Sequence, residues 1–116
     1  MQNPTGEALV EGSTAGRDGS DKKLQQWVTE SKLVALISDN YAVELHDGKL
    51  APGECVMLPL HHHCLFKTGV NLGEIWRLSE LADWLRANNR SRFLMTAPPL
   101  RLPGAVGSPA TPVATV

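Results

Sequence analysis

Apolar and polar residues in the first half of the chain follow a helical period and then form a continuous apolar run. Apolar residues recur at i, i+3 and i+4 spacing, which predicts a helix from Asp21 to about Ser31 that Ser20 or Asp21 caps. These apolar positions are Leu24, Trp27 and Val28. The short apolar run from Leu33 to Ser38 predicts a buried strand.

The middle of the chain repeats this order of helix and strand. Residues 60–68 are consistent with a short helix, which Gly69 would end in the left-handed conformation. The segment 70–75 is then expected to be extended. The clearest helix covers 79–87, with Ser79 as its cap and an apolar stripe along one face. The stripe consists of Leu78, Leu81, Ala82 and Leu85.

A last strand is predicted over 92–96, where Pro98 and Pro99 stop it. Alternating helices and strands favour an α/β fold. Because the runs 33–37 and 92–96 are both apolar without interruption, we expect them to be neighbouring strands of one sheet, covered by the helix 79–87. We further expect a flexible arm over 1–20, a folded domain over 21–109 and a tail over 110–116.

Length, net charge and the absence of long apolar runs argue against several classes of protein. With 116 residues the chain has room for one domain, and its net charge of -1 argues against a nucleic-acid or anionic-membrane binder. No apolar run approaches the length of about 20 residues that a membrane span requires, and the start lacks a secretory pattern. We therefore expect a cytoplasmic protein with reduced Cys55 and Cys64, and we expect Cys64 to be a small buried residue.

Three consecutive histidines and a later carboxylate are the first candidate site. His61, His62 and His63 precede Glu74, and imidazole with carboxylate suits Zn, Mn or Fe. Successive helical residues point about 100° apart, so one of these histidines can be a ligand while its neighbours point elsewhere. The alternative is a solvated histidine cluster with an unrelated surface glutamate.

Polar residues after the first strand form the second candidate group, because open α/β sheets bind ligands at the carboxyl ends of their strands. The group consists of Asp39, Asn40, Tyr41 and Glu44. The alternative is a turn in which Asp and Asn satisfy backbone groups. Trp27 and Trp84 lie on or beside helical apolar stripes and are expected in the core, whereas Trp76 could line a pocket near Glu74.

Taken together, three segments resemble the cyclase family of metal-dependent hydrolases, which includes kynurenine formamidase and isatin hydrolase. They are Gly16 to Glu44, His61 to Leu78, and Arg92 to Pro109, the last with the closing pattern Ala-Pro-Pro-Leu…Gly-Ser-Pro. The resemblance implies that 21–109 is the carboxy-terminal portion of a swivelling β/β/α cyclase-like domain. It also implies hydrolysis of a small-molecule amide or lactam at its C–N bond, as in tryptophan catabolism.

In that family a late His and a Glu about a dozen residues further on complete a site for a divalent metal, here Zn or Mn. The resemblance thus assigns Glu74 as a ligand and His61 or His62 as a ligand or general base. The family's upstream motif His-x-Gly-Thr-His-x-Asp-x-Pro-x-His is not in this sequence. We therefore expect this chain alone to be inactive. The alternative is a non-catalytic half-domain that acts as a binding or assembly module; open strand edges would favour a homo-oligomer.

Overall fold

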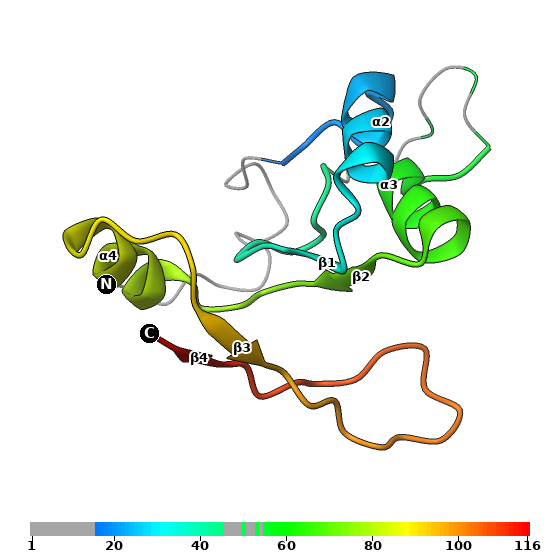
Figure 1. Cartoon of the computed structure of the whole chain (residues 1–116). Helices are drawn as coiled ribbons and strands as arrows, with labels where there is room; N and C mark the ends of the chain where they lie inside the picture. The colour runs from blue at the N-terminus through cyan, green and yellow to red at the C-terminus, as the bar shows by residue number, and fades with distance from the viewer. Residues whose placement is uncertain (1–15, 46–49, 51–52, 54) are drawn as a thin grey trace, which may run out of the picture. The chain divides into compact units, whose positions relative to one another are not determined.

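The computed structural model describes residues 16–45, 50, 53 and 55–116, and Figure 1 shows its helices and strands. The chain divides into two compact units, Met1–Trp76 and Arg77–Val116. Of the expected arm over 1–20, residues 1–15 lie outside the described residues. The remainder does not behave as an arm, because Arg17 forms a parallel bridge with Glu44 and its carbonyl accepts a 2.7 Å hydrogen bond from the Leu45 N–H.

Among the described residues of the first unit, helix α2 (Lys22–Ser31) comes first, and it confirms the predicted helix. The Asp21 side chain caps it by accepting a 2.8 Å hydrogen bond from the Lys23 N–H. The helix ends at Lys32, whose φ of 55° lies in the left-handed region.

Strands β1 (Ala35–Ile37) and β2 (Asn71–Gly73) form a parallel pair in which Leu36 lies opposite Leu72. The pairing continues past the strand ends, since the Ser38 N–H donates to the Gly73 carbonyl at 2.9 Å. Parallel strands place their carboxyl ends at the same edge of the sheet. The polar segment after β1 and Glu74 after β2 therefore begin side by side.

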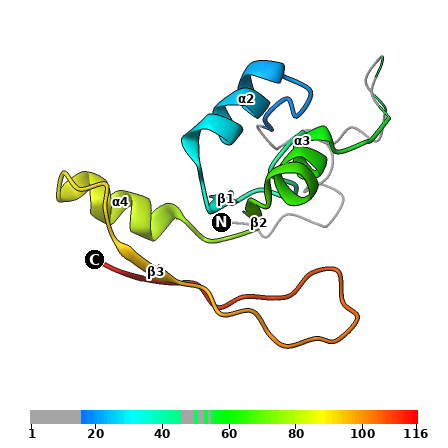
Figure 2. The same ribbon diagram turned by 45° about the vertical axis from the view of Figure 1, so that its right-hand side comes forward.

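The helical segment predicted over 60–68 is confirmed as two consecutive pieces, α3 (Pro59–His61) and the π-helical η1 (His62–Thr68). Gly69 follows with φ 71°, the left-handed conformation expected of it. Figures 1 and 2 show this segment beside α2, with which it packs.

The core of the first unit lies between α2, the α3–η1 segment and the β1–β2 pair. Its fully buried residues are Val28, Val43, Leu60, Cys64 and Val70. Four partly buried leucines pack against them: Leu24, Leu33, Leu36 and Leu72. The prediction that Cys64 is a small buried residue is confirmed.

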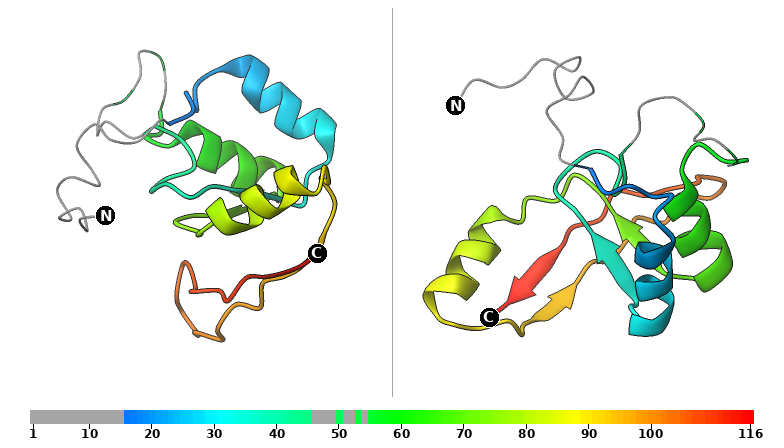
Figure 3. Two further views of the ribbon diagram at one scale, coloured as in Figure 1. Left: turned by 90° about the vertical axis from the view of Figure 1, so that its left-hand side faces the viewer. Right: turned by 90° about the horizontal axis from the view of Figure 1, so that it is seen from above.

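The second unit contains α4 (Ser79–Ala87) and an antiparallel pair, β3 (Leu94–Thr96) with β4 (Val113–Thr115), which is clearest in the right panel of Figure 3. The expected helix and strand are thus present. Leu78, and not Ser79, stands at the N-cap of α4, without a side-chain hydrogen bond. Part of the expected tail over 110–116 forms β4, which pairs with β3.

The expected pairing of the strands near 33–37 and 92–96 is wrong. Strand β1 pairs with β2, and β3 pairs with β4. All three residues of β3 are exposed, and α4 buries none of its residues, so the expected burial of this strand under the helix is also wrong. An unbroken apolar run indicates a strand but contains no information about its partner. The mixture of helices and strands nevertheless confirms the α/β class.

Candidate functional site

His61 is the centre of the site, because its ring lies between two carboxylates. It is the last residue of α3, and its Nδ1 lies 2.7 Å from Glu44 Oε1. On the other side of the ring, Nε2 lies 3.0 Å from Glu74 Oε1. The side chain is 21% exposed, so most of the ring is held within the protein.

Glu44 reaches His61 from the segment that follows β1, and its side chain is fully buried. Two backbone N–H groups donate to its carboxylate, that of Leu60 to Oε2 at 2.9 Å and that of His61 to Oε1 at 2.7 Å. A buried charge requires such donors, because its loss of hydration is otherwise very costly.

Glu74 comes from the residue that follows β2, and its side chain is 29% exposed. Its Oε1 accepts a hydrogen bond from the Val43 N–H at 3.1 Å as well as facing His61. The parallel pairing of β1 and β2 explains this meeting, since it brings the segments after both strands to one edge of the sheet.

The two carboxylates determine the protonation of the imidazole. The hydrogen bond to Glu44 raises the pKa of His61 above its usual value, burial opposes this, and the charges of Glu44 and Glu74 add to the increase. Ionised carboxylates only accept hydrogen bonds, so both ring nitrogens donate when both contacts are made. The two carboxylates therefore favour the protonated form of the ring.

The three histidines point in different directions, as successive helical residues must. The ring of His62 stacks on Phe66, with centroids 5.3 Å apart, and His63 Nε2 lies 2.8 Å from the Thr29 hydroxyl. Of the two histidines proposed to accompany Glu74, the structure places His61 beside it. His62 is directed to another neighbour, so its predicted role as a ligand has no support in this geometry.

The polar residues after the first strand, which formed the second predicted group, do not gather at one site. Asp39 and Tyr41 are exposed, and the backbone carbonyl of Asn40 accepts a 3.2 Å hydrogen bond from the Ile75 N–H. Glu44 alone joins His61. This contact could not be predicted from the sequence, because 17 residues separate Glu44 from His61 and no spacing rule connects them. Gly19, which lies against the Glu44 carboxylate, was likewise not identified.

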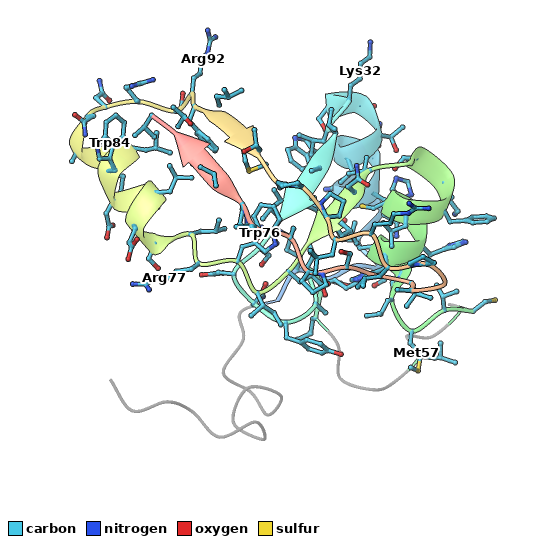
Figure 4. All side chains as sticks on the ribbon, turned by 90° about the horizontal axis from the view of Figure 1, so that it is seen from below. Lys32, Met57, Trp76, Arg77, Trp84 and Arg92 are labelled. Carbon is cyan, nitrogen blue, oxygen red and sulfur yellow. The ribbon has the colours of Figure 1, made fainter. Side chains whose placement is uncertain are left out.

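Trp27 and Trp84 are less buried than expected. Trp27 is 52% exposed, so its expected burial is wrong. Trp84, labelled on α4 in Figure 4, is half-buried. The Arg90 guanidinium lies over its ring, with Arg90 Cζ 5.3 Å from the ring centroid. Trp76, also labelled there, is half-buried, and its ring lies so close to Gly73 that a Cβ there would stand 3.1 Å from Trp76 Cε2.

Within the described ranges, no three His, Cys, Asp or Glu side chains gather as a ready metal site. His61 Nε2 and Glu74 Oε1 are two potential metal donors, and Glu44 contacts the other nitrogen of the His61 ring.

No helix in the described part of the chain is both long and apolar enough to cross a membrane. Burial raises the pKa of the Cys64 thiol, as does the negative charge of Glu44, so this cysteine is not a nucleophile of the site.

Comparison with solved structures finds a similar protein, described as a novel cyclase. Its crystal structure matches 82% of this chain with a TM-score of 0.67 and 37% sequence identity. This chain spans only 29% of that protein's length. A scan of protein-family models and a search of curated proteins both found no match. The likeness supports a relationship with the cyclase family and agrees with a partial α/β domain.

Proposed function

We propose that this chain is part of a metal-dependent hydrolase that cleaves the C–N bond of a small-molecule amide or lactam. The observation that carries the proposal is the facing pair His61 Nε2 and Glu74 Oε1, 3.0 Å apart. Two donors on one zinc ion lie roughly 3 to 4 Å apart, since each bond measures about 2.0–2.2 Å. The similarity to a cyclase over most of the chain supports the proposal that this pair binds a metal ion.

The donor set fits a divalent ion such as Zn²⁺ or Mn²⁺, for which imidazole nitrogen and carboxylate oxygen are common ligands. His61 and Glu74 would hold the ion, and further ligands would come from outside this pair, because a catalytic zinc usually has three protein ligands. When bound, such an ion would polarise the substrate carbonyl and lower the pKa of a water molecule.

The residues of this chain contribute orientation and a proton site. The Val43 N–H fixes the Glu74 carboxylate at 3.1 Å, so its Oε1 is already directed toward His61 before a ligand arrives. His61 can bind a cation at Nε2 only after that nitrogen has lost its proton, so loading of the site releases a proton. Because the side chains of His61 and Glu74 are 21% and 29% exposed, the pair is partly accessible to a small molecule.

A non-catalytic assembly module is the second candidate, because the β3–β4 pair presents apolar side chains to solvent. Leu94 and Val113 are 67% and 53% exposed, on strands in which every residue is exposed. An open two-stranded sheet with such residues favours pairing with another chain. Sedimentation analysis would test it: a homo-oligomer that dissociates on Leu94→Lys supports this function, whereas a monomer contradicts it.

The test of the hydrolase proposal is a chimera in which residues 16–116 replace the matching part of the similar cyclase. We expect Zn²⁺- or Mn²⁺-dependent hydrolysis of N-formylkynurenine or isatin by the chimera, and none by the present chain alone. His61→Ala and Glu74→Gln should each lower this activity by more than the roughly 10–100-fold that loss of an outer-shell partner costs.

His62→Ala is the matched control, since this neighbouring ring stacks on Phe66 and should leave the activity within about threefold. A folded chimera that hydrolyses neither substrate, or one in which His62→Ala is as damaging as His61→Ala, would contradict the proposal.

A further inference from the structure

We propose that Glu44 is a positioning residue for His61: its buried carboxylate holds the Nδ1 proton and thereby directs the Nε2 lone pair of the neutral ring toward Glu74. The inference deepens the proposed function and rests on it for what Nε2 binds. It assigns a role to a residue that neither touches the substrate nor binds the ion.

The hydrogen bonds of Glu44 fix the carboxylate independently of the ring. The N–H groups of Leu60 and His61 hold one oxygen each, at 2.9 and 2.7 Å. The oxygen that accepts from the His61 backbone also lies 2.7 Å from Nδ1 of the same residue. His61 is thus held at two points by one rigid acceptor, which determines the rotation of its ring.

The choice of ring nitrogen follows from the chemistry of the acceptor. Each ring nitrogen faces a carboxylate that can only accept a proton's hydrogen bond, but the contact of Nδ1 is the shorter one, 2.7 Å against 3.0 Å, and its Glu44 carboxylate is fully buried whereas that of Glu74 is 29% exposed, so the single proton of the neutral ring belongs on Nδ1. A neutral imidazole has one N–H, which leaves Nε2 with a lone pair on the edge that faces Glu74. A carboxylate behind a metal-binding histidine commonly has this effect on its tautomer and basicity.

Gly19 provides the space in which the carboxylate lies. A Cβ at this position would overlap Glu44 Oε2, would lie 2.6 Å from its Cδ and would lie 3.1 Å from the Leu60 Cβ. The surrounding turn is anchored, because the buried Gln25 side chain donates to the Gly19 carbonyl at 2.7 Å. The segment 17–19 therefore covers the Glu44 carboxylate. A side chain at Gly19 would displace this carboxylate and still leave the glutamate in the chain.

The competing explanation is that Glu44 serves only to satisfy the backbone N–H groups of Leu60 and His61. Both explanations predict that the loss of Glu44 destabilises the protein. They differ in the tautomer of His61, which a purely structural role would leave unspecified.

The test is a long-range ¹H–¹⁵N spectrum of the full chain with ¹⁵N-labelled histidine, at a pH where the His61 resonances report a neutral ring. His61→Gln identifies the signals. We expect the Nδ1–H tautomer in the wild-type chain, and a mixture or reversal in Glu44→Gln and in Gly19→Ala. The controls Glu80→Gln, at a 75% exposed side chain, and Gly107→Ala, at an open position, should leave the tautomer unchanged.

A Zn²⁺ titration of the same samples gives the second readout, and each of the two site variants should bind roughly 10–100-fold more weakly. A wild-type His61 with its proton on Nε2 would overturn the inference, even if neither variant folds. An unchanged tautomer in folded Glu44→Gln would also overturn it. An Nδ1–H tautomer in a wild-type chain that binds no Zn²⁺ would instead count against the proposed function and leave the positioning role in place.

Discussion

Replacing Leu60 by alanine tests the packing that holds the site in place. Leu60 is fully buried in the core of the first unit and directly precedes His61. Its backbone N–H donates to Glu44, and this hydrogen bond does not depend on the side chain. The substitution therefore removes packing while it preserves the polar contacts around His61.

The expected loss follows from the burial of the side chain. Removing a fully buried leucine side chain costs about 2–5 kcal/mol in the free energy of unfolding, depending on how far the surroundings collapse into the cavity. With a urea dependence of about 1–3 kcal/mol per molar for a small protein, the unfolding midpoint should fall by roughly 0.7–5 M. Urea titration followed by far-ultraviolet circular dichroism measures this change.

Leu65→Ala is the matched control, because Leu65 lies on η1 in the same helical segment and is 54% exposed. Its loss should change the free energy of unfolding by no more than about 0.5–1 kcal/mol. If Leu60→Ala and Leu65→Ala cost the same, Leu60 is not the core residue described, and the account of how His61 is positioned fails.

Three further predictions follow from contacts of the first unit. The free energy of unfolding should fall as the pH rises above about 6.5. The reason is that the raised pKa of His61 contributes stability that is complete below the unfolded-state pKa and is lost as the folded ring deprotonates. Denaturation curves at several pH values should show a flatter pH dependence for His61→Gln, and an unchanged slope would refute the prediction. Asp21→Ala should cost about 0.5–2 kcal/mol in the same urea assay through loss of the α2 cap, whereas a neutral result would show that the cap contributes nothing. A thiol reagent should modify the exposed Cys55 rapidly and the buried Cys64 only on unfolding, and equal rates in native buffer would contradict the described burial.

Local elements were largely predictable because their causes are local. The caps and apolar spacing of α2, the apolar run of β1 and the glycine that ends η1 all lie within a few residues of the elements that they define. The partners of strands were not predictable in this way. Strand β3 pairs with β4, a segment 17 residues further on that was expected to be a tail.

The candidate site was predictable only in part for the same reason. The pairing of a histidine from the triplet with Glu74 was expected from the resemblance, whereas the sequence could not tell which of His61 and His62 lies beside Glu74. Glu44 was singled out as a polar residue after a strand, but its contact with His61 depends on the fold. The role of Gly19 depends on space around the Glu44 carboxylate, which no sequence pattern records.

The central claim is that His61 and Glu74 share one divalent ion, and paramagnetic Mn²⁺ tests it most directly. Added in small amounts to the ¹⁵N-labelled full chain, Mn²⁺ should first broaden the resonances of His61, Glu74 and the adjacent Val43, even if binding is weak. The effect should disappear in Glu74→Gln and persist in His62→Ala. Broadening centred on His62 and His63, or unchanged in Glu74→Gln, would mean that the triplet binds cations as a surface cluster and that His61 and Glu74 do not share an ion.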